Sequence, residues 1–572
     1  MKILLGLLLI GLLALVTVAK PRKFFNGRDS VGSVRQLSKN ESLARSNNAG
    51  EAAITQKLDH FDENNTATWQ QRYFFNLDYR RADVNFLYIS GESTAGLETI
   101  QDETNPIVMY AKNFAAGLYA IEHRFYGMSR PTEQFDDDSL KYLTSRQALA
   151  DAAEFIKLVN AGYFVSQKWI VFGGSYAGNL ALWMRELYPQ LVIGAAIEDD
   201  IRKFDNKYTN TTGCAVQVKS AFDTVSEYMQ NEEGRHLLDR YFHPDPKLTS
   251  FEDLSENVIA SFYSGVIKPF MDSAQYGGIG ITFPVDELCS TMTSGTATPI
   301  QLLSGLNMGL INPNYTQRVE DLSTKTWDDT AAANDRAFMW QSCNEFGYFK
   351  STDRGSNLFG SVIPNNLNLN LCKDVFHIDP FTLKDNIRKT NAYFGGRDYY
   401  TGTNVVITYG TQDPWHMLSK YTAQHESVAI SVIEGGVHTR DMFPICQSDI
   451  CDDGVNRTQT LIVNNMERWL GGYDEVPAKV DIIDHVGQRP LTYTNDILAP
   501  IQPNDLQPTP ALDTAESTRA KRSSKADKRR GRWLKRRNED VKSKAWPPNL
   551  RSGTVHQPLD HFNSSNGAVF SQ

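Results

Sequence analysis

The sequence predicts an α/β fold, in which helices cover both faces of a parallel sheet and a mainly helical insertion caps it. Short apolar runs that resemble buried strands alternate with helix-like segments. A Gly-Gly-Ser turn joins one of these runs directly to an amphipathic segment. The strand pattern stops near residue 208 and resumes after about residue 374. Alternation of this kind is typical of parallel sheets, which form sites beyond the carboxyl ends of their strands.

Length and composition suit a large globular protein. The chain has 572 residues, 41% hydrophobic and 22% charged, enough for a sizeable core plus an insertion. Its net charge of −9 is unevenly distributed, because the segment 519–537 contains eleven Lys or Arg residues and one Asp. The rest of the chain therefore carries about −19, which argues against a nucleic-acid-binding protein and suits an acidic or extracellular setting.

The amino terminus has the pattern of a secretory signal peptide. Lys2 precedes an apolar run from Ile3 to Val18, and small residues follow, which places a signal peptide at residues 1–19. An uncleaved membrane anchor is the alternative, although the run is short for a full span. We expect residues 20–53, which are polar and without periodicity, to form a flexible lead or propeptide.

The expected elements of the sheet domain fall in two parts, 54–207 and 375–485, around a helical cap at 208–374. In the first part we expect strands at 85–90, 117–121, 168–172 and 191–197, with helices at 106–114 and 145–159. In the cap we expect helices at 221–232 and 332–341. In the second part we expect strands at 404–409 and 428–433 and a last helix at 458–470.

The carboxyl-terminal part contains a linker and an internal repeat. Residues 486–553 are Pro-rich and then basic, and we expect them to be disordered. The stretch 519–522 is either a dibasic processing site or part of a solvated linker. Residues 554–572 repeat the start of the catalytic unit, since Gln557-Pro558-Leu559-Asp560-His561-Phe562 matches 56–61 in a register that continues to Gln572. The chain is therefore either a fragment of a tandem protein or carries a truncated duplicate.

Cysteines and glycosylation sequons fit the secretory pathway. An even number of cysteines predicts disulfides, and no cysteine has the spacing of a zinc site. We expect neither a metal nor a cofactor. The pairs 446/451 and 343/372 are plausible and would leave 214 with 289, but the connectivity stays open. The cysteines are Cys214, Cys289, Cys343, Cys372, Cys446 and Cys451. The sequons are at Asn40, Asn64, Asn210, Asn314, Asn456 and Asn563.

The Gly-Gly-Ser turn has the form of a nucleophile elbow, which exposes a serine on a sharp turn between a strand and a helix. Ser175 is the candidate nucleophile. Gly173 and Ala177 supply the small flanking side chains that such a close strand–helix approach requires. A Gly-rich turn with an incidental serine is the alternative.

A catalytic base and its orienting acid are expected on loops after late strands, in the chain order serine, acid, histidine. Asp413 and His438 follow two consecutive predicted strands in that order. Each could separately be an ordinary loop residue, and His416 is a rival base on the acid's own loop. We expect Glu122-His123-Arg124 to form a buried charge network. The backbone N–H of Tyr176 and the loop at Gly91 are the expected oxyanion donors.

Several motifs together resemble one family of secreted and lysosomal serine peptidases. The motifs are Leu58-Asp59-His60-Phe61, Gln71-Arg72-Tyr73-Phe74, Glu122-His123-Arg124-Phe125-Tyr126-Gly127, Tyr142-Leu143-Thr144-Ser145, Gly173-Gly174-Ser175-Tyr176, Cys343-Asn344-Glu345-Phe346-Gly347-Tyr348 and Asp413-Pro414-Trp415-His416. Over roughly residues 56–472 the chain resembles the family of prolyl carboxypeptidase, dipeptidyl peptidase II and thymus-specific serine protease, the last most strongly.

The resemblance implies an α/β-hydrolase core with an inserted helical cap. It also implies a serine exopeptidase that acts next to proline at either end of short peptides, with Ser175, Asp413 and His438 as the catalytic residues. Peptides are then the expected partners, with no nucleic acid and no membrane span after signal cleavage, and a homodimer stays open. The alternatives are a catalytically silent relative that acts as a binding protein, and an esterase or lipase on the same fold.

Two departures from the family pattern concern substrate binding. Ser90-Gly91-Glu92-Ser93 stands where the family usually has Gly-Gly-Glu-Gly, and Ile197-Glu198-Asp199-Asp200 stands where it tends to have Ser-Ala-Pro. We therefore expect Glu92, Glu198, Asp199 and Trp415 to contact substrate, with a preference for basic residues.

Overall fold

A computed structural model describes residues 48–198, 213–277, 284–295, 297–307, 309, 311–353, 358–443 and 453–471. All of them lie in the first of two compact units, Met1–Thr494. The expected signal peptide, the linker at 486–553 and the repeat at 554–572 lie outside the described residues.

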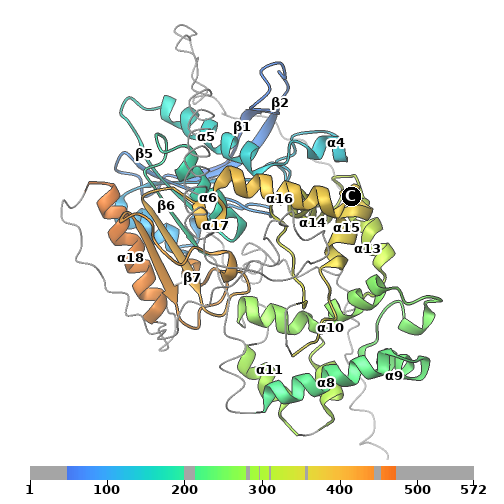
Figure 1. Ribbon diagram of the computed structural model, residues 1–572. Coiled ribbons are helices and arrows are strands. Elements are labelled where there is room, and N and C mark those ends of the chain that lie inside the picture. Colours follow the sequence, from blue (N-terminus) through green and yellow to red (C-terminus); the bar gives the residue numbers. More distant parts are fainter. Residues whose placement is uncertain are drawn as a thin grey trace, which may run out of the picture. The chain divides into compact units, whose positions relative to one another are not determined.

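An eight-stranded sheet forms the core, in the order β1-β2-β4-β3-β5-β6-β7-β8 (Figure 1). The strands are β1 Ala49–Lys57, β2 Thr68–Asn76, β3 Val84–Ile89, β4 Gly117–Ile121, β5 Lys168–Gly174, β6 Gly194–Glu198, β7 Val405–Gly410 and β8 Val428–Ile433. Strands β4, β3, β5, β6, β7 and β8 run parallel to one another, whereas β2 pairs antiparallel with both β1 and β4. The expectation of a parallel sheet is therefore wrong at this edge.

Strand β1 also corrects the expected lead, because it begins at Ala49 and not after residue 53. Its sequence, AGEAAITQK, contains few residues that favour strands. It pairs with β2 along its whole length, from Ala49 opposite Asn76 to Lys57 opposite Thr68. Pairing with a stronger neighbouring strand stabilises it, and a sequence pattern does not show such pairing.

Side chains of the central strands alternate between two apolar clusters, one on each face of the sheet. In β3, Phe86 belongs to one cluster and Leu87 to the other. Helices α5 (Ser145–Ala161) and α6 (Tyr176–Leu187) contribute to the cluster with Leu87. Helices α3 (Pro106–Phe114) and α18 (Asp453–Trp469) contribute to the cluster with Phe86. The expected two-sided covering of the sheet is confirmed.

A helical cap lies between β6 and β7 in the sequence. Its elements are α8 Cys214–Met229, α9 Glu232–Phe242, η2 Leu248–Ser250, α10 Glu256–Tyr276, α11 Val285–Met292, α12 Pro299–Gly305, α13 Tyr315–Ser323, α14 Thr330–Gln341, the π-helical turn η3 Ser342–Phe346 and α15 Asn366–Phe376. The disulfides Cys214–Cys289 and Cys343–Cys372 are present, while Cys446 and Cys451 lie outside the described residues.

Two expected boundaries in the cap are wrong. The helix expected at 221–232 spans a break, because α8 ends at Met229 and Asn231 caps α9 by accepting a hydrogen bond from the Gly234 N–H. The domain boundary at 374 falls inside α15. After α15, helix α16 (Pro380–Phe394) returns to the sheet domain, where Phe394 stacks on Trp183 of α6 at 3.9 Å between ring centroids.

The remaining short elements are α2 Glu98–Gln101, α4 Asp137–Leu140, α17 Gly396–Tyr399, η4 His416–Leu418 and η5 Arg440–Met442. Among the helices that the structure describes, none has both the length and the apolar character needed to cross a membrane.

Candidate active site

Ser175 occupies a strained turn between β5 and α6. Its backbone has φ 57° and ψ −133°, a conformation that non-glycine residues rarely adopt. A Cβ atom at Gly173 would lie only 2.1 Å from the carbonyl oxygen of Ala177. The strand and helix therefore cross too closely for any side chain at 173, as expected for an elbow that exposes the serine.

The loops after β7 and β8 bring Asp413 and His438 to the same edge of the sheet as Ser175. The two strands are parallel neighbours, and their loops are joined by a 2.7 Å hydrogen bond from the Gln412 N–H to the Gly436 carbonyl oxygen. A Cβ atom at Gly410 would lie 2.4 Å from the backbone of Gly436. This close approach holds the two loops in one arrangement.

Asp413 and His438 form a buried hydrogen-bonded pair. The Nδ1 atom of His438 contacts Oδ2 of Asp413, and Oδ1 of Asp413 accepts a 3.0 Å hydrogen bond from the Trp415 N–H. Burial raises the pKa of the Asp413 carboxyl, although the interactions with His438 and Trp415 oppose that rise. Because Nδ1 faces the carboxylate, Nε2 is the ring atom left to exchange a proton with a substrate or nucleophile.

One cavity of about 270 Å³ connects these residues with the cap. Ser175, His438, Gly91, Glu92 and Trp415 line it on the side of the sheet domain. Cap residues from α10, α13, α14, α15 and the segment after η3 complete its wall. The structure thus brings together the serine, the histidine and most of the residues that the sequence pointed to, while Asp413 lies fully buried behind the histidine.

Backbone donors are available next to Ser175. Tyr176 is the first residue of α6, so its N–H is not used inside the helix. A Cβ atom built on Gly91 would lie 3.4 Å from that of Ala177, which places the Gly91 loop against the start of the helix. Glu122 fixes this loop by accepting a 3.0 Å hydrogen bond from the Ala95 N–H. Both expected oxyanion donors therefore border the elbow.

The rival base His416 has an unsuitable environment. It lies in η4 and is buried, and burial together with the charge of His438 lowers its pKa to about 2. An imidazole that holds a proton so weakly is a poor general base near neutral pH.

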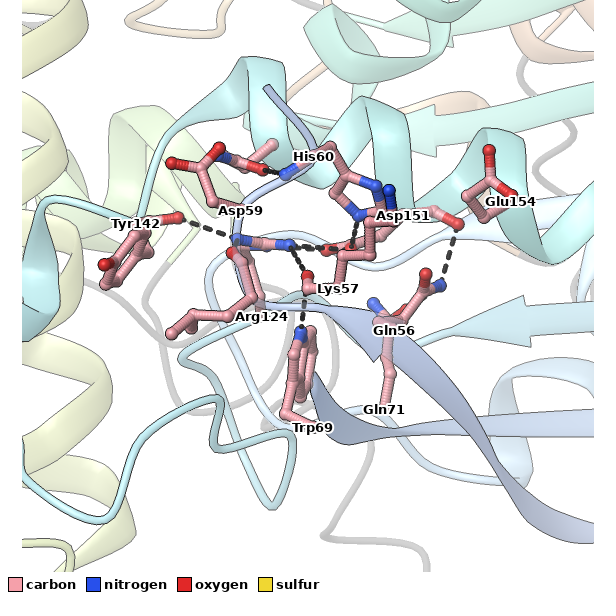
Figure 2. A network of polar contacts seen from close by, with 12 residues as sticks. Gln56, Lys57, Asp59, His60, Trp69, Gln71, Arg124, Tyr142, Asp151 and Glu154 are labelled. Carbon is pink, nitrogen blue, oxygen red and sulfur yellow. Dashed lines mark hydrogen bonds and ion pairs between the residues drawn. The ribbon is translucent and has the colours of Figure 1, made fainter. Parts of the chain in front are cut away.

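Glu122, His123 and Arg124 lie in buried polar networks, as expected. Arg124 donates hydrogen bonds of 2.6 and 2.7 Å to the two carboxylate oxygens of Asp151, and Oδ1 of Asp151 also contacts Nε2 of His60 at 2.7 Å. Figure 2 shows the guanidinium of Arg124 and the ring of His60 directed at this carboxylate. A second Asp–His pair therefore exists, among residues that do not line the cavity.

A polar network that the sequence pattern does not indicate joins the elbow to the cap. The hydroxyl group of Tyr176 contacts His123 Nε2 at 3.1 Å and Ser145 Oγ at 3.0 Å, and accepts a 2.8 Å hydrogen bond from Gln341. Glu345 accepts hydrogen bonds from the Ser145 N–H and from Gln341. Burial lowers the pKa of His123 to about 4 and raises that of Glu345 to about 7. Four of these residues stand in the motifs quoted above, but their mutual contacts have no local signal.

Some predicted residues are not placed at the site. Glu198 is the last residue of β6, but its side chain and the whole of Asp199 lie outside the described part. Of the sequons, Asn64 and Asn456 are exposed, and the side chain of Asn314 caps α13. Asn40, Asn210 and Asn563 lie outside the described residues.

Comparisons with known proteins match most of the chain. A family model described as serine carboxypeptidase S28 matches residues 56–459. A Caenorhabditis elegans protein that carries a serine protease name is 34% identical over 440 residues, covering 68% of this chain and 79% of that protein. Thymus-specific serine protease of Mus musculus is 28% identical over 454 residues, covering 73% of this chain and 87% of that protein. Lysosomal Pro-X carboxypeptidase of Homo sapiens is 24% identical over 451 residues, covering 74% of this chain and 89% of that protein.

Proposed function

The chain belongs to the serine carboxypeptidase S28 family and is a serine-type peptidase, and we propose that it is an exopeptidase that cleaves short peptides next to proline. Its catalytic residues are then Ser175, His438 and Asp413. The observation that carries this assignment is the buried Asp413–His438 pair, in which the histidine borders the same cavity as the elbow serine.

In the first step, Nε2 of His438 removes the proton from the Ser175 hydroxyl as its oxygen attacks the peptide carbonyl carbon. Asp413 stays ionised, holds the histidine in the required tautomer and stabilises the imidazolium that forms. The N–H groups of Tyr176 and Gly91 donate to the developing oxyanion, where charge appears in the transition state. The prebuilt turn at Ser175 holds the hydroxyl in position before substrate arrives.

In the second step, His438 gives its proton to the amine of the leaving group, and the carbon–nitrogen bond breaks. The remaining acyl group is then esterified to Ser175. A water molecule, deprotonated by His438, attacks this ester and releases the acid, which regenerates the serine hydroxyl.

The cavity supports short peptides as substrates. Residues of the cap and of the sheet domain both line it, so a substrate must fit between these two parts. Trp415 and Tyr348 present aromatic rings to it, with centroids 6.2 Å apart, and aromatic surfaces suit the apolar ring of proline. The relative named lysosomal Pro-X carboxypeptidase supports proline at the cleaved bond.

Two disulfides support folding in the oxidising secretory pathway. Within that pathway we assign the protein to the lysosome or the extracellular space.

A fluorophosphonate probe tests the nucleophile. The wild-type protein should be labelled and Ser175→Ala should not, whereas Ser264→Ala, which removes a different hydroxyl from the cavity wall, should be labelled normally. Absence of labelling in the folded wild type would identify a catalytically silent relative. A peptide-library digest with mass readout, at acidic and neutral pH and beside ester substrates, then tests the preference for proline and for peptides.

A further inference from the structure

We propose that Lys350 binds the free terminal carboxylate of the substrate, so that the enzyme removes residues from the carboxyl end of peptides. This inference rests on the proposed exopeptidase function and adds the direction of cleavage. Lys350 belongs to the cap, in the segment that follows η3, and it lines the cavity together with Ser175 and His438.

The position of the Lys350 ammonium is set by contacts with both walls of the cavity. Its Nζ donates a 2.8 Å hydrogen bond to Oε1 of Gln275 at the end of α10. It also lies 5.5 Å from the ring centroid of Trp415, which stands on the loop of Asp413. The backbone carbonyl oxygen of the same Gln275 accepts a 2.9 Å hydrogen bond from the His438 N–H. One residue of α10 therefore holds the lysine beside the histidine loop.

The chemistry of acylation requires the leaving group at this wall. His438 protonates the amine that departs, so the residue on the carboxyl side of the cut bond must lie against the histidine. If that residue is the last of the peptide, its carboxylate is separated from the amine by a single carbon atom. An ammonium group there forms a charge-assisted hydrogen bond with the carboxylate. In a peptide that continues, the same position holds a neutral amide.

Two further cations of the cavity wall pair with carboxylates of the cap. Lys268 pairs with Asp272 one turn later on α10, and Arg318 donates a 2.6 Å hydrogen bond to Asp335. An enzyme that cleaves from the amino end would instead need an acidic side chain to bind the free amino terminus of the peptide. Glu92 is the candidate for that role, because it lines the cavity and its neighbour Gly91 packs against the elbow helix. Cleavage from the carboxyl end would therefore depend on the cation Lys350, and cleavage from the amino end on the anion Glu92, at different walls of one cavity.

Matched substrates separate these possibilities. An amino-blocked peptide with proline before its last residue is compared as the free acid and as the terminal amide. The wild type should cleave the free acid with a KM at least about tenfold below that of the amide, a factor that one good ion pair supplies. Lys350→Gln should raise KM for the acid about tenfold, leave KM for the amide nearly unchanged and preserve kcat. Lys350→Arg should restore much of the difference.

Lys268→Gln is the control, because it removes a cation from the same cavity and should not change the ratio of the two KM values. Equal loss on both substrates in Lys350→Gln would assign the lysine a structural role and overturn the proposal. A wild type that releases dipeptides from free amino termini, with an activity lost in Glu92→Gln, would also overturn it. Failure of the function itself is recognised separately, by absence of fluorophosphonate labelling of Ser175.

Discussion

His438–Asp413 and His60–Asp151 are two buried Asp–His pairs in one domain, with different neighbours. In both, the aspartate is fully buried and the histidine is nearly so. Asp151 also accepts two hydrogen bonds from Arg124, and the charge of that arginine lowers its pKa despite a burial that would raise it. For Asp413, burial prevails and the pKa is raised.

The surroundings of the two carboxylates indicate which environment suits a reactive Asp–His pair. With Arg124 beside it, the carboxylate of Asp151 is held ionised as part of a structural ion pair, and His60 is one of several partners (Figure 2). The carboxylate of Asp413 contacts the histidine, accepts a hydrogen bond from the Trp415 N–H and interacts electrostatically with Lys350, and its histidine borders a cavity that is also lined by a serine. Three features distinguish the two pairs: the ring nitrogen that faces the carboxylate, the arginine hydrogen-bonded to Asp151, and the access of His438 to a cavity with a serine.

The largest expected effect is on catalysis, at the active-site pair. Asp413→Asn should lower kcat by about 10⁴-fold, because an amide favours the wrong tautomer of His438. It should cost little stability, since it removes a buried charge whose pKa burial has raised. Steady-state kinetics and thermal unfolding measure the two effects. A strongly unfolded variant would place Asp413 in the same structural class as Asp151.

The second pair should show the reverse behaviour. Asp151→Asn leaves Arg124 as a buried charge without its carboxylate and should cost roughly 3–5 kcal/mol of unfolding free energy. Denaturant titration measures this loss, and the protein that stays folded should still react with the fluorophosphonate probe. Asp223→Asn is the control, because its exposed pair with Lys219 should contribute at most about 1 kcal/mol. Loss of labelling in folded Asp151→Asn would contradict a purely structural role.

Glu345, a buried carboxyl group near the elbow, should make the free energy of unfolding depend on pH. Its folded-state pKa of about 7 lies above the ordinary 4.5, so its contribution to stability is complete below pH 4.5 and is lost as the pH rises to about 7. Glu345→Gln cannot titrate, so its destabilisation relative to wild type should shrink by about 3 kcal/mol over that range. Unfolding titrations at several pH values measure the change, with the exposed Glu252→Gln as control. A destabilisation that stays constant with pH would contradict the raised pKa.

The smallest effect is expected at His60. His60→Ala removes one hydrogen bond to Asp151 while Arg124 keeps its two, so the loss should be roughly 1–3 kcal/mol. The matched variant His438→Ala should abolish turnover with a smaller change in stability. Thermal unfolding and kcat of the two variants, measured side by side, test the contrast. Loss of turnover in a folded His60→Ala protein would contradict the expected contrast between the two histidines.

The sequence by itself determined the parts of the molecule whose signals are local. The strands at 117–121 and 428–433 and the helix at 106–114 have the predicted bounds, because apolar patterning and flanking turns mark them. Ser175, Asp413 and His438 could be singled out for the same reason. Each lies on the turn or loop that follows a recognisable strand, and the chain order of such sites is known in advance.

Only the tertiary structure decided the features that depend on distant segments. The antiparallel edge strand β1 forms because β2 pairs with it, not because its own residues favour a strand. Gln275, Glu345 and Lys350 come from the cap, and their roles at the elbow and in the cavity arise from contacts across 75 to 200 residues of sequence. The apolar pattern of a segment indicates which of its side chains are buried, but not which groups they contact there. The two Asp–His pairs differ in those contacts, both in the ring nitrogen that faces the carboxylate and in the groups around it.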